Sequence, residues 1–561
     1  MTVKNLKIVI GQINPIVGYI DYNFKKIKDV ILHNQNADLV IFPEMVLCGY
    51  PLQDHILDPL IQEENKYYIN KVKELETQSA IIFGTFTQPE ELKQKIQRFH
   101  NSAIVIKNNK IIHLENKKLL PTYDIFDERR YFSYDDKFNP VQIKDTKIGI
   151  LICEDIWDDV RHYETNVAKK HVENGAELLI VINASPYHIG KFQIRKDMVS
   201  KKSRELEVPI IYVNMVGGLD EIVFDGRTFI TDHRGKIVYK GRAFQEDVCK
   251  VTLEFDNEKF VNIISEKEMF IDLDWREEVL EALKLNLYDY YHKSGIFDGI
   301  VLGLSGGIDS AFTAYICAQS IGPKNVNCIM MPTKYTSQES LDLSKSLCHN
   351  LGVNYIIHPI DSIFQSYENS LQDVLGELQF DVADENLQAR IRATILMYYS
   401  NKYNWLLVST GNKSEIGVGY CTLYGDTSGG KNVPGDLLKV QIYDICNWIN
   451  QTKEIIPEGI IERPPTAELR ENQKDSDSLP PYETLDQILK ELIQNGIGSE
   501  YRNLKEKGFD KETINKVRKL YLNSEYKRRQ LVQTIRVSES AFGIGRRYPV
   551  LKRIDLTKEF E

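Results

Sequence analysis

Short runs of aliphatic and β-branched residues alternate with amphipathic stretches along the first half of the chain. The runs predict strands over residues 7–13, 37–44, 79–86, 98–114, 146–155, 176–185 and 208–217. Residues 23–36 and 63–78 instead repeat apolar side chains at the spacing of a helix. The pattern predicts an α/β domain, rich in strands, over residues 1–255.

The second half begins after a mixed polar and apolar connector, which we expect over residues 256–275. A helical stretch at 276–295 is followed by apolar runs at 299–305, 325–332, 353–360 and 404–410, and each run precedes a helical segment. Alternation of strands and helices favours an open parallel sheet that binds its ligand at the carboxyl ends of the strands. The sequence therefore predicts a second α/β domain over residues 276–561.

Composition narrows the class of protein. The 561 residues exceed the ~250–300 at which single cores stop growing, and a net charge of −10 disfavours nucleic acid or an anionic membrane as partner. We find neither a signal peptide nor an apolar run of ~18 residues, so we expect a cytoplasmic protein without a membrane partner. Eight cysteines without a C-x-x-C pair indicate buried thiols in a reducing compartment.

A glycine-rich loop, "SGGIDS" at 305–310, joins one predicted strand to a helical segment. Its glycines let the backbone approach a ligand, and the free N–H groups of a helix start favour an anion. No Gly-Lys-Ser/Thr follows, so this phosphate-binding loop is not a Walker A motif. A carboxylate beside phosphate needs an intervening cation, which makes Asp309 a candidate Mg²⁺ ligand. The alternative is an ordinary glycine turn with a capping serine.

Three other polar positions lie at or just after predicted strands in the first half. They are Glu44, the pair Lys117 and Lys118 before a Leu-Pro turn, and Cys153. Taken singly, they are typical of a solvated carboxylate, a solvated lysine face and a small buried thiol. Together they suit amide hydrolysis, in which Glu44 takes the proton of Cys153 and a lysine stabilises the oxyanion.

The segments "FPE", "NKKLLPTY" and "CEDIW" that carry these residues resemble the nitrilase superfamily, whose triad is Glu, Lys and Cys. The block "LPTYDIFDERRYF" resembles the glutaminase domain of the glutamine-dependent NAD⁺ synthetases. The resemblance implies a nitrilase-like α-β-β-α sandwich and, by its K-x-x-L-P spacing, assigns the lysine role to Lys117. It also implies contacts to glutamine from Tyr123, Ser185 and Lys191.

The "SGGIDS" loop is similar to the ATP-pyrophosphatase superfamily, also called adenine nucleotide alpha hydrolase-like, whose members adenylylate different substrates. Later blocks, at 385–401, 409–426 and 464–486, are similar to NAD⁺ synthetases. The resemblance implies that ATP is bound by Gly303, Leu304, Ser305, Gly306, Gly307, Ile308, Asp309, Ser310 and Thr410. It implies Mg²⁺ ligands at Asp309 and Glu415, and contacts to deamido-NAD⁺ from Asn386, Glu415 and Lys527.

Some positions stay open at this stage. Arg390 and Arg392 suit either substrate phosphates or neighbouring acids. The chain has Lys439-Val440 where the family often has Lys-Thr, and Thr336-Ser337 where a Ser-Ser pair is usual. Both departures affect substrate fit at most.

The resemblance implies that deamido-NAD⁺ is adenylylated by ATP and then amidated with ammonia released from L-glutamine, within a homo-oligomer and through an internal tunnel. Two alternatives remain. One is a different ATP-dependent amidotransferase, although the chain starts Met1-Thr2 and has no N-terminal Cys nucleophile. The other is an inactive nitrilase-like binding module, which the intact triad disfavours.

Overall fold

The computed structural model describes residues 4–89, 99–161, 163–256, 259–377, 379–496, 500–552 and 554. It divides into two compact units, Met1–Gly217 with Val223–Asp274 and Gly218–Ile222 with Trp275–Glu561. The segment expected as a connector includes strand β15 (Lys259–Ser265), which pairs antiparallel with β14 (Asp247–Asp256). Arg98 of the expected strand at 98–114, and residues 257 and 258 of the connector, lie outside the described residues.

Two sheets form the first unit. The seven-stranded sheet has the order β15, β14, β1 (Lys4–Gln12), β2 (Leu39–Ile41), β3 (Ala80–Thr87), β4 (His100–Lys107) and β5 (Lys110–Asn116). The six-stranded sheet has the order β13 (Ile237–Lys240), β12 (Phe229–Thr231), β9 (Ile210–Asn214), β8 (Leu178–Asn183), β7 (Thr146–Ile152) and β6 (Val141–Ile143). A separate two-stranded ribbon consists of β10 (Val216–Leu219) and β11 (Ile222–Asp225).

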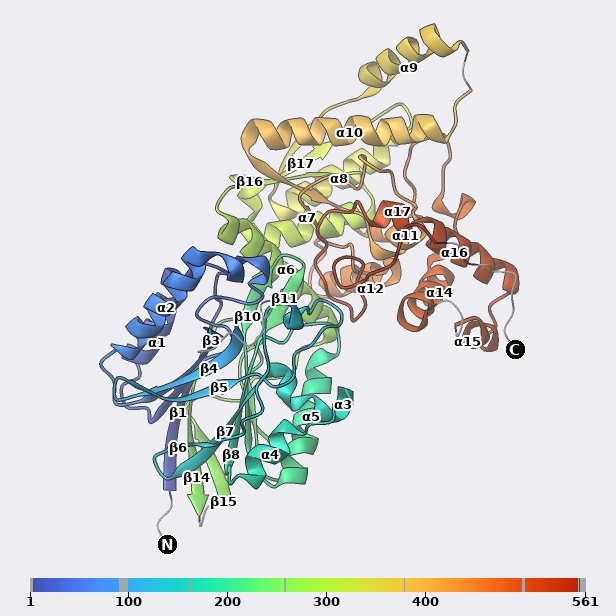
Figure 1. The fold of residues 1–561 in the computed structure, drawn as a ribbon. Helices are drawn as coiled ribbons and strands as arrows, with labels where there is room; N and C mark the ends of the chain where they lie inside the picture. Colours follow the sequence, from blue (N-terminus) through green and yellow to red (C-terminus); the bar gives the residue numbers. More distant parts are fainter. Residues whose placement is uncertain are drawn as a thin grey trace. The chain divides into compact units, whose positions relative to one another are not determined.

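The two large sheets pack face to face. Alternate residues of β1 and β7, such as Ile8, Ile10, Ile148 and Ile150, lie in one shared apolar core, as the two-residue period of a strand requires. Figure 1 shows α1 (Ile20–Leu32) and α2 (Pro59–Lys73) on one side of the sandwich, with α4 (Val167–Glu173) and α5 (Lys191–Leu206) on the other.

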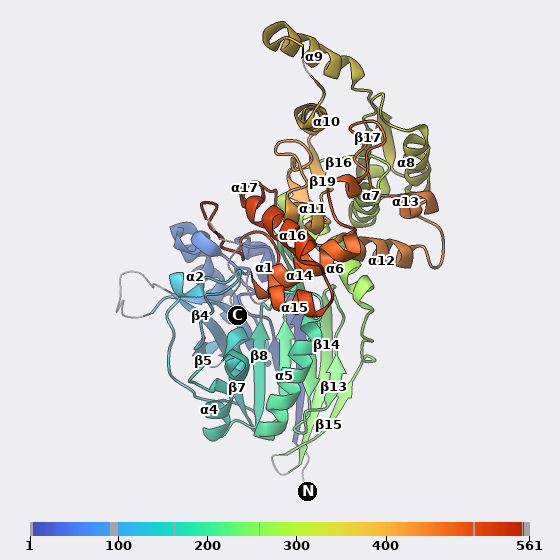
Figure 2. The same ribbon diagram turned by 90° about the vertical axis from the view of Figure 1, so that its right-hand side faces the viewer.

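Figure 2 shows α4 and α5 in front of the six-stranded sheet. There the opposite residues of the strands, such as Leu151 and Val181, form a second core with Phe192 and Val199 of α5. A short helix, α3 (Asp158–Arg161), follows β7 along the chain. The expected α-β-β-α sandwich is confirmed.

The second unit contains a five-stranded sheet in which every pairing is parallel. Its order is β18 (Asn354–Ile357), β17 (Val326–Met330), β16 (Gly299–Gly303), β19 (Trp405–Ser409) and β20 (Lys431–Asn432). The helices are α6 (Trp275–Ser294), α7 (Ile308–Ile321), α8 (Gln338–Leu351), α9 (Asp361–Leu375), α10 (Val382–Tyr403), α11 (Lys413–Val418), α12 (Lys439–Ile449), α13 (Glu458–Glu462), α14 (Tyr482–Asn495), α15 (Glu500–Glu506), α16 (Lys511–Asn523) and α17 (Glu525–Arg528).

The parallel arrangement places the carboxyl ends of β16 and β19, which are direct neighbours, at the same edge of the sheet. The loops that follow these two strands begin α7 and α11. A separate core, with Ile416, Leu489 and Val517, joins α11 to α14 and α16. The open parallel sheet expected from the sequence is confirmed, and the loops that follow β16 and β19 lie at the edge where such sheets usually bind ligands.

The eight cysteines are all free thiols; seven are buried and Cys421 is half-buried. This agrees with the absence of a disulfide framework expected from their spacing. Within the described ranges, every helix is too short or too polar to cross a membrane.

Candidate active sites

The three residues of the predicted triad meet in the first unit, although they follow different strands. Glu44 comes after β2, Lys117 after β5 and Cys153 after β7, and all three are buried. Lys117 Nζ lies 2.8 Å from Glu44 Oε1. Gly84 of β3 permits this close packing, because a Cβ at that position would stand 2.6 Å from the Cα of Glu44.

The carboxylate of Glu44 is held from several sides. Asn101 Nδ2 donates to its Oε1 at 2.7 Å, and the backbone N–H of Ala184 donates to its Oε2 at 2.8 Å. Together with Lys117, these donors come from β4, the end of β8 and the end of β5. A carboxylate fixed in this way has one orientation, which a general base requires.

Lys117 stands between two carboxylates, because its ammonium also contacts Glu128 Oε1 at 2.8 Å. Burial opposes the charge, but Glu128 and Glu44 outweigh burial and hold the pKa of Lys117 well above its usual value. The two carboxylates therefore favour the charged form of Lys117. Tyr50 Oη donates to the same oxygen of Glu128 at 2.8 Å, and burial raises the pKa of Glu128.

Sequence reasoning missed Glu128. It lies in a one-turn 3-10 helix, Glu128–Arg130, inside the block "FDERRYF". Glu128 follows no predicted strand and belongs to no stretch with helical periodicity. Its only signal in the sequence is its position beside two arginines. The structure shows a carboxylate only 3% exposed in direct contact with Lys117.

Cys153 lies on a sharp turn between β7 and the 3-10 helix Cys153–Ile156, with a left-handed φ of 47°. Burial raises the pKa of the Cys153 thiol well above its usual value, the charge of Glu44 raises it further, and Lys117 opposes them. The resting thiol is therefore neutral, and its attack on an amide needs a base. Glu44 is the carboxylate with the largest electrostatic effect on this thiol.

Lys118 lies on a different network from Lys117. Its ammonium contacts Glu115 and the backbone oxygen of Asn116, and lies 3.3 Å from Asp135. The side chain is buried, so the solvated lysine face considered from the sequence is wrong. The two adjacent lysines bind different carboxylates.

The three residues predicted to contact glutamine lie in the same unit as Cys153. Tyr123 Oη donates to Glu154 Oε2 at 2.8 Å, and Ser185 Oγ accepts from Arg195 Nε at 3.1 Å. Lys191, at the start of α5, stands 4.1 Å from the ring centre of Trp157. Burial lowers the pKa of Lys191 to about 8, with further lowering from Arg195 and Arg161.

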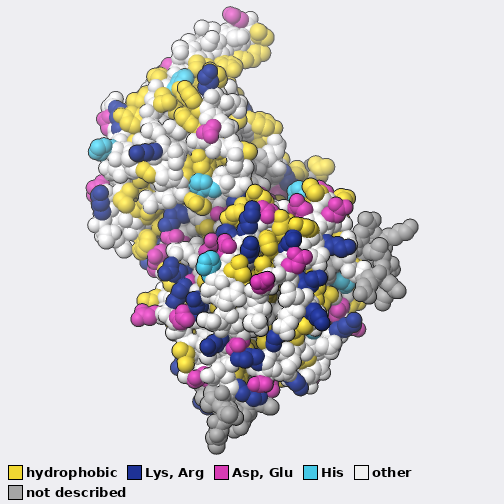
Figure 3. All heavy atoms as spheres, turned by 90° about the vertical axis from the view of Figure 1, so that its left-hand side faces the viewer, with side chains coloured by type: hydrophobic (Ala, Val, Ile, Leu, Met, Phe, Trp, Pro, Cys, Tyr) yellow, Lys and Arg dark blue, Asp and Glu magenta, His cyan; other side chains and the backbone are white. Residues whose placement is uncertain are grey.

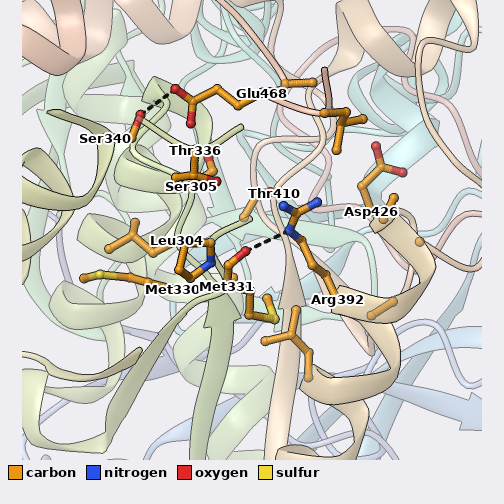
Figure 4. Close-up of a pocket in the computed structure, with 18 of the residues that line it drawn as sticks. Leu304, Ser305, Met330, Met331, Thr336, Ser340, Arg392, Thr410, Asp426 and Glu468 are labelled. Atoms are coloured by element: carbon orange, nitrogen blue, oxygen red, sulfur yellow. Dashed lines mark hydrogen bonds between the residues drawn. The ribbon is translucent and has the colours of Figure 1, made fainter. Parts of the chain in front are cut away.

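The predicted phosphate-binding loop of the second unit spans Gly303–Ser310, from the end of β16 to the start of α7. Gly306 has a φ of 84°, and a Cβ there would stand 2.8 Å from the backbone oxygen of Ser340, so the site requires glycine. The loop borders a cavity of about 260 Å³, whose lining includes Gly303, Leu304, Ser305 and Thr410 (Figure 4). An adjoining cavity of about 200 Å³ is lined by residues 305–310, Thr410 and Glu415.

Asp309 and Glu415 share one cation. The ammonium of Lys439 contacts Asp309 Oδ2 directly and lies 3.3 Å from Glu415 Oε1, while Asn412 Nδ2 donates to Asp309 Oδ1 at 3.0 Å. Burial raises the pKa of Glu415, Lys439 opposes this and Asp309 adds to it. In the sequence, Lys439 was noted only because Val440 follows it where the family often has Thr. Its contact with Asp309 was missed, because no motif or spacing connects the two residues.

The pair Asp309 and Glu415 fits a divalent cation, because both carboxylates already face a single positive charge. Mg²⁺ typically takes one or two carboxylates and completes its shell with phosphate oxygens and water. Within the described residues, no cluster of three or more His, Cys, Asp or Glu side chains could hold a metal. Mg²⁺ here would thus depend on the phosphates of a bound nucleotide.

Of the two arginines left open by the sequence, Arg392 lines the larger cavity. Figure 4 shows its guanidinium beside Thr410 and Asp426, with Nε donating to the backbone oxygen of Met331 at 3.1 Å. Burial lowers the pKa of Arg392 to about 10. Arg390 instead donates to the backbone oxygen of Leu423 at 3.2 Å.

Thr336-Ser337 and Val440 are the positions where the chain differs from the residues usual in the family. Thr336 lines the larger cavity, and Ser337 caps α8 by accepting from the backbone N–H of Ser340 at 3.1 Å. Val440 donates its backbone N–H to Asp486 at 3.0 Å.

The predicted deamido-NAD⁺ contacts Asn386 and Lys527 are not part of either cavity lining, but both hold the segment 419–422 that follows α11. Thr422 Oγ1 donates to Asn386 Oδ1 at 2.6 Å. The ammonium of Lys527 donates to the backbone oxygens of Gly419 and Cys421 at 2.7 and 2.6 Å. The structure thus places both residues around one segment, next to the helix that carries Glu415.

Comparisons with known proteins agree with both halves. The family model described as "Carbon-nitrogen hydrolase" matches residues 7–260, and the one described as "NAD synthase" matches residues 279–531. A glutamine-dependent NAD(+) synthetase of Synechocystis sp. is 39% identical over 97% of this chain and 98% of its own length. One of Thermotoga maritima is 37% identical over 98% of this chain and 99% of its own.

Solved structures extend the likeness to three dimensions. A glutamine-dependent NAD+ synthetase from Acinetobacter baumannii, in complex with adenosine diphosphate, is 38% identical, covers 98% of both chains and has a TM-score of 0.77. A second such synthetase, from Cytophaga hutchinsonii, has a TM-score of 0.82 over 98% of both chains. At 22% identity this second likeness supports the fold alone.

Proposed function

Because the chain belongs to the glutamine-dependent NAD⁺ synthetases, ligases that use glutamine as nitrogen donor and ATP as co-substrate, we propose that its two sites divide one reaction between them. The first unit releases ammonia from L-glutamine. The second unit uses ATP to activate deamido-NAD⁺ and joins it to that ammonia. The products are NAD⁺, AMP, pyrophosphate and glutamate.

In the first site, Glu44 takes the proton of Cys153 and the thiolate attacks the carboxamide carbon of glutamine. Lys117 stabilises the oxyanion that develops on the carboxamide oxygen. Glu44 returns the proton to the leaving ammonia, and a γ-glutamyl thioester remains on Cys153. Glu44 then activates a water molecule, which hydrolyses the thioester to glutamate and restores the thiol.

Recognition of glutamine in this site is assigned to Tyr123, Ser185 and Lys191. Lys191 supplies a cation for the α-carboxylate of the substrate. Ser185 and Tyr123 supply hydroxyl groups, each already oriented by a charged neighbour, Arg195 and Glu154 respectively.

In the second site, the nicotinate carboxylate of deamido-NAD⁺ attacks the α-phosphate of ATP, and pyrophosphate leaves. Ammonia then attacks the acyl carbon of the adenylate, and AMP leaves. The loop at 303–310 and Thr410 bind the nucleotide, while Asn386, Glu415 and Lys527 bind deamido-NAD⁺. Asp309 and Glu415 would hold Mg²⁺, which when bound neutralises charge on the phosphates.

The observation that carries this proposal is the contact of Lys117 with Glu44 in a buried site beside Cys153. An inactive binding module has no need of two buried carboxylates around a lysine, since such groups are costly to bury. The adenosine diphosphate reported for the Acinetobacter baumannii relative supports an adenine nucleotide as a ligand of this chain, and we assign it to the cavity beside the loop at 303–310.

The test is Cys153→Ala, assayed for NAD⁺ formation with glutamine and, separately, with ammonium. We expect glutamine-dependent formation to fall to background, because water cannot replace a positioned nucleophile. Ammonium-dependent formation should persist, most visibly at alkaline pH, where more of the ammonia is neutral. Equal losses with both nitrogen sources and an unchanged melting curve would contradict the division of labour.

We also propose a homo-oligomer, supported by apolar side chains exposed in the second unit. Edge strand β18 exposes Tyr355, Ile356 and Ile357, and α9 exposes Tyr367 and Val374. Figure 1 shows α9 at the top of the second unit, and Figure 3 shows hydrophobic side chains at the surface in the upper part of the view. The occupant we propose for this face is a second copy of the chain.

The cytoplasmic location, and a tunnel for ammonia, stay predictions.

A further inference from the structure

Asp155 is a buried carboxylate two residues beyond Cys153, with only 1% of its surface exposed. Its Oδ2 accepts the backbone N–H of Ile152 at 3.0 Å. Its Oδ1 accepts the backbone N–H groups of Lys118 and Leu119, at 2.9 and 2.8 Å. One side chain therefore joins the turn that carries Cys153 to the segment that carries Lys117.

The turn at Cys153 needs such support. A residue with a Cβ held at a left-handed φ, here 47°, costs on the order of 1–3 kcal/mol and persists only where its surroundings fix it. The bond from Ile152 to Asp155 spans this residue within the chain. The two bonds from Lys118 and Leu119 anchor the same carboxylate to another strand end.

The cost of burying the charge of Asp155 is offset by a nearby cation and by backbone N–H groups. Burial raises the pKa of Asp155 to about 6, while the charge of Lys118 and the backbone N–H groups of Leu119 and Ile152 oppose burial. Asp155 is therefore ionised at neutral pH. An ionised carboxylate makes stronger hydrogen bonds than a neutral amide, which suits a rigid link.

We infer that Asp155 is a positioning residue for amide hydrolysis, because it sets the separation between the Cys153 thiol and the ammonium of Lys117. Glu44 and Glu128 fix the far end of the Lys117 side chain, and Asp155 fixes the backbone immediately after it. The inference rests on the proposed glutaminase function of this site.

The test compares Asp155→Ala and Asp155→Asn in the full-length protein, with kcat and KM for glutamine measured below the melting temperature. We expect Asp155→Ala to lower kcat by about 100-fold with KM little changed, since a misplacement of about 1 Å costs this much. Asp155→Asn should be intermediate, because its carbonyl still accepts from Lys118 and Leu119 while its amide group faces the N–H of Ile152. Ammonium-dependent NAD⁺ formation should be unchanged in both.

Asp232→Ala is the matched control. This carboxylate also accepts two backbone N–H groups, from Arg234 at 2.9 Å and Lys236 at 2.8 Å. It follows Thr231, which pairs with Ile210 at the start of β9, so it lies at the sheet edge opposite the carboxyl ends of β7 and β8. We expect its loss to affect the melting temperature and leave kcat for glutamine intact.

The outcomes separate this inference from the function on which it rests. Glutamine hydrolysis that survives in Cys153→Ala would overturn the proposed function itself. If Cys153→Ala is inactive but Asp155→Ala retains its kcat per folded molecule, or loses no more than Asp232→Ala, the positioning role is wrong and the proposed function stands.

Discussion

At the scale of single residues, neighbours in sequence have separate partners. Lys117 contacts Glu44 and Glu128, whereas Lys118 contacts Glu115 and Asp135. The K-x-x-L-P spacing favours Lys117, which contacts Glu44 of the predicted triad, and its role stays a prediction. Because its partners are largely buried carboxylates, we expect Lys118 to contribute to the free energy of unfolding and not to catalysis.

Lys117→Ala should reduce glutamine turnover by about 10²–10³-fold, the scale of one lost oxyanion donor. Lys118→Ala should lose little turnover per folded molecule, and no more than Asp155→Asn, because it removes a charge near Asp155 but keeps the backbone donors of that carboxylate. It should lower the free energy of unfolding by about 3 kcal/mol, because Glu115 loses the ammonium partner of its buried carboxylate. Glutaminase assays paired with denaturant unfolding check both. A large loss of turnover in Lys118→Ala, with Lys117→Ala active, would reverse the assignment.

We expect Lys191 to make the binding of glutamine depend on pH. Since burial lowers its pKa to about 8, the ammonium is protonated below that pH and neutral above it. If the cation binds the α-carboxylate, KM for glutamine should rise as pH increases through about 8, with kcat less affected. Lys191→Arg should abolish that rise, because a guanidinium stays charged. A rise that persists unchanged in Lys191→Arg would place its cause elsewhere, such as in the α-ammonium of glutamine.

At the scale of secondary-structure elements, the strand ends that carry the candidate residues were predictable from the sequence. Apolar runs located β2, β7, β16 and β19, and the polar residues that follow them became the candidates. Because side chains alternate along strands and parallel strands end at one edge, a one-dimensional pattern predicts which strand ends lie together.

The residues of each site that the sequence did not predict lie away from the strand ends. Glu128 lies on a single 3-10 turn, and Lys439 begins α12, far along the chain from Asp309. Neither position has a periodic pattern or a motif that connects it to its partner. Their roles depend on long-range packing, which brings a buried cation to a buried carboxylate only in the folded chain.

Asp309 and Glu415 follow the neighbouring strands β16 and β19, and this placement leads to a prediction for Asp309→Asn. NAD⁺ formation should be lost with either nitrogen source, because the Mg²⁺ site and Lys439 both lose a charged partner. Glutamine hydrolysis should survive at least in part, since its residues lie in the other unit. Asp342→Asn is the control, because it neutralises an exposed carboxylate of α8 whose cation partner is Lys345, and it should keep synthesis from both nitrogen sources. Near wild-type synthesis from ammonium in Asp309→Asn would contradict the metal assignment.

At the scale of the whole molecule, each unit has its own core, and the full-length relatives have both halves in the same order. The exposed apolar side chains are a feature of the second unit that its own fold leaves unexplained. Helix α9 exposes Tyr367, Leu371 and Val374, which recur at helical spacing along one face. A monomer gains nothing from such a stripe, and a second copy would cover it.

We therefore expect the wild-type mass in solution to be a multiple of the 64.8 kDa chain. The double change Tyr367→Glu with Val374→Glu should shift the mass toward one chain, because two carboxylates would be buried unpaired at the interface. In the free chain both positions are exposed, so the melting temperature should change little.

Leu60→Glu, at an exposed apolar position on α2 of the first unit, is the matched control and should keep the wild-type mass. Light scattering after size-exclusion chromatography measures each mass. A wild-type mass of a single chain would refute the oligomer, and a double variant that keeps the wild-type mass would exclude α9 from the interface.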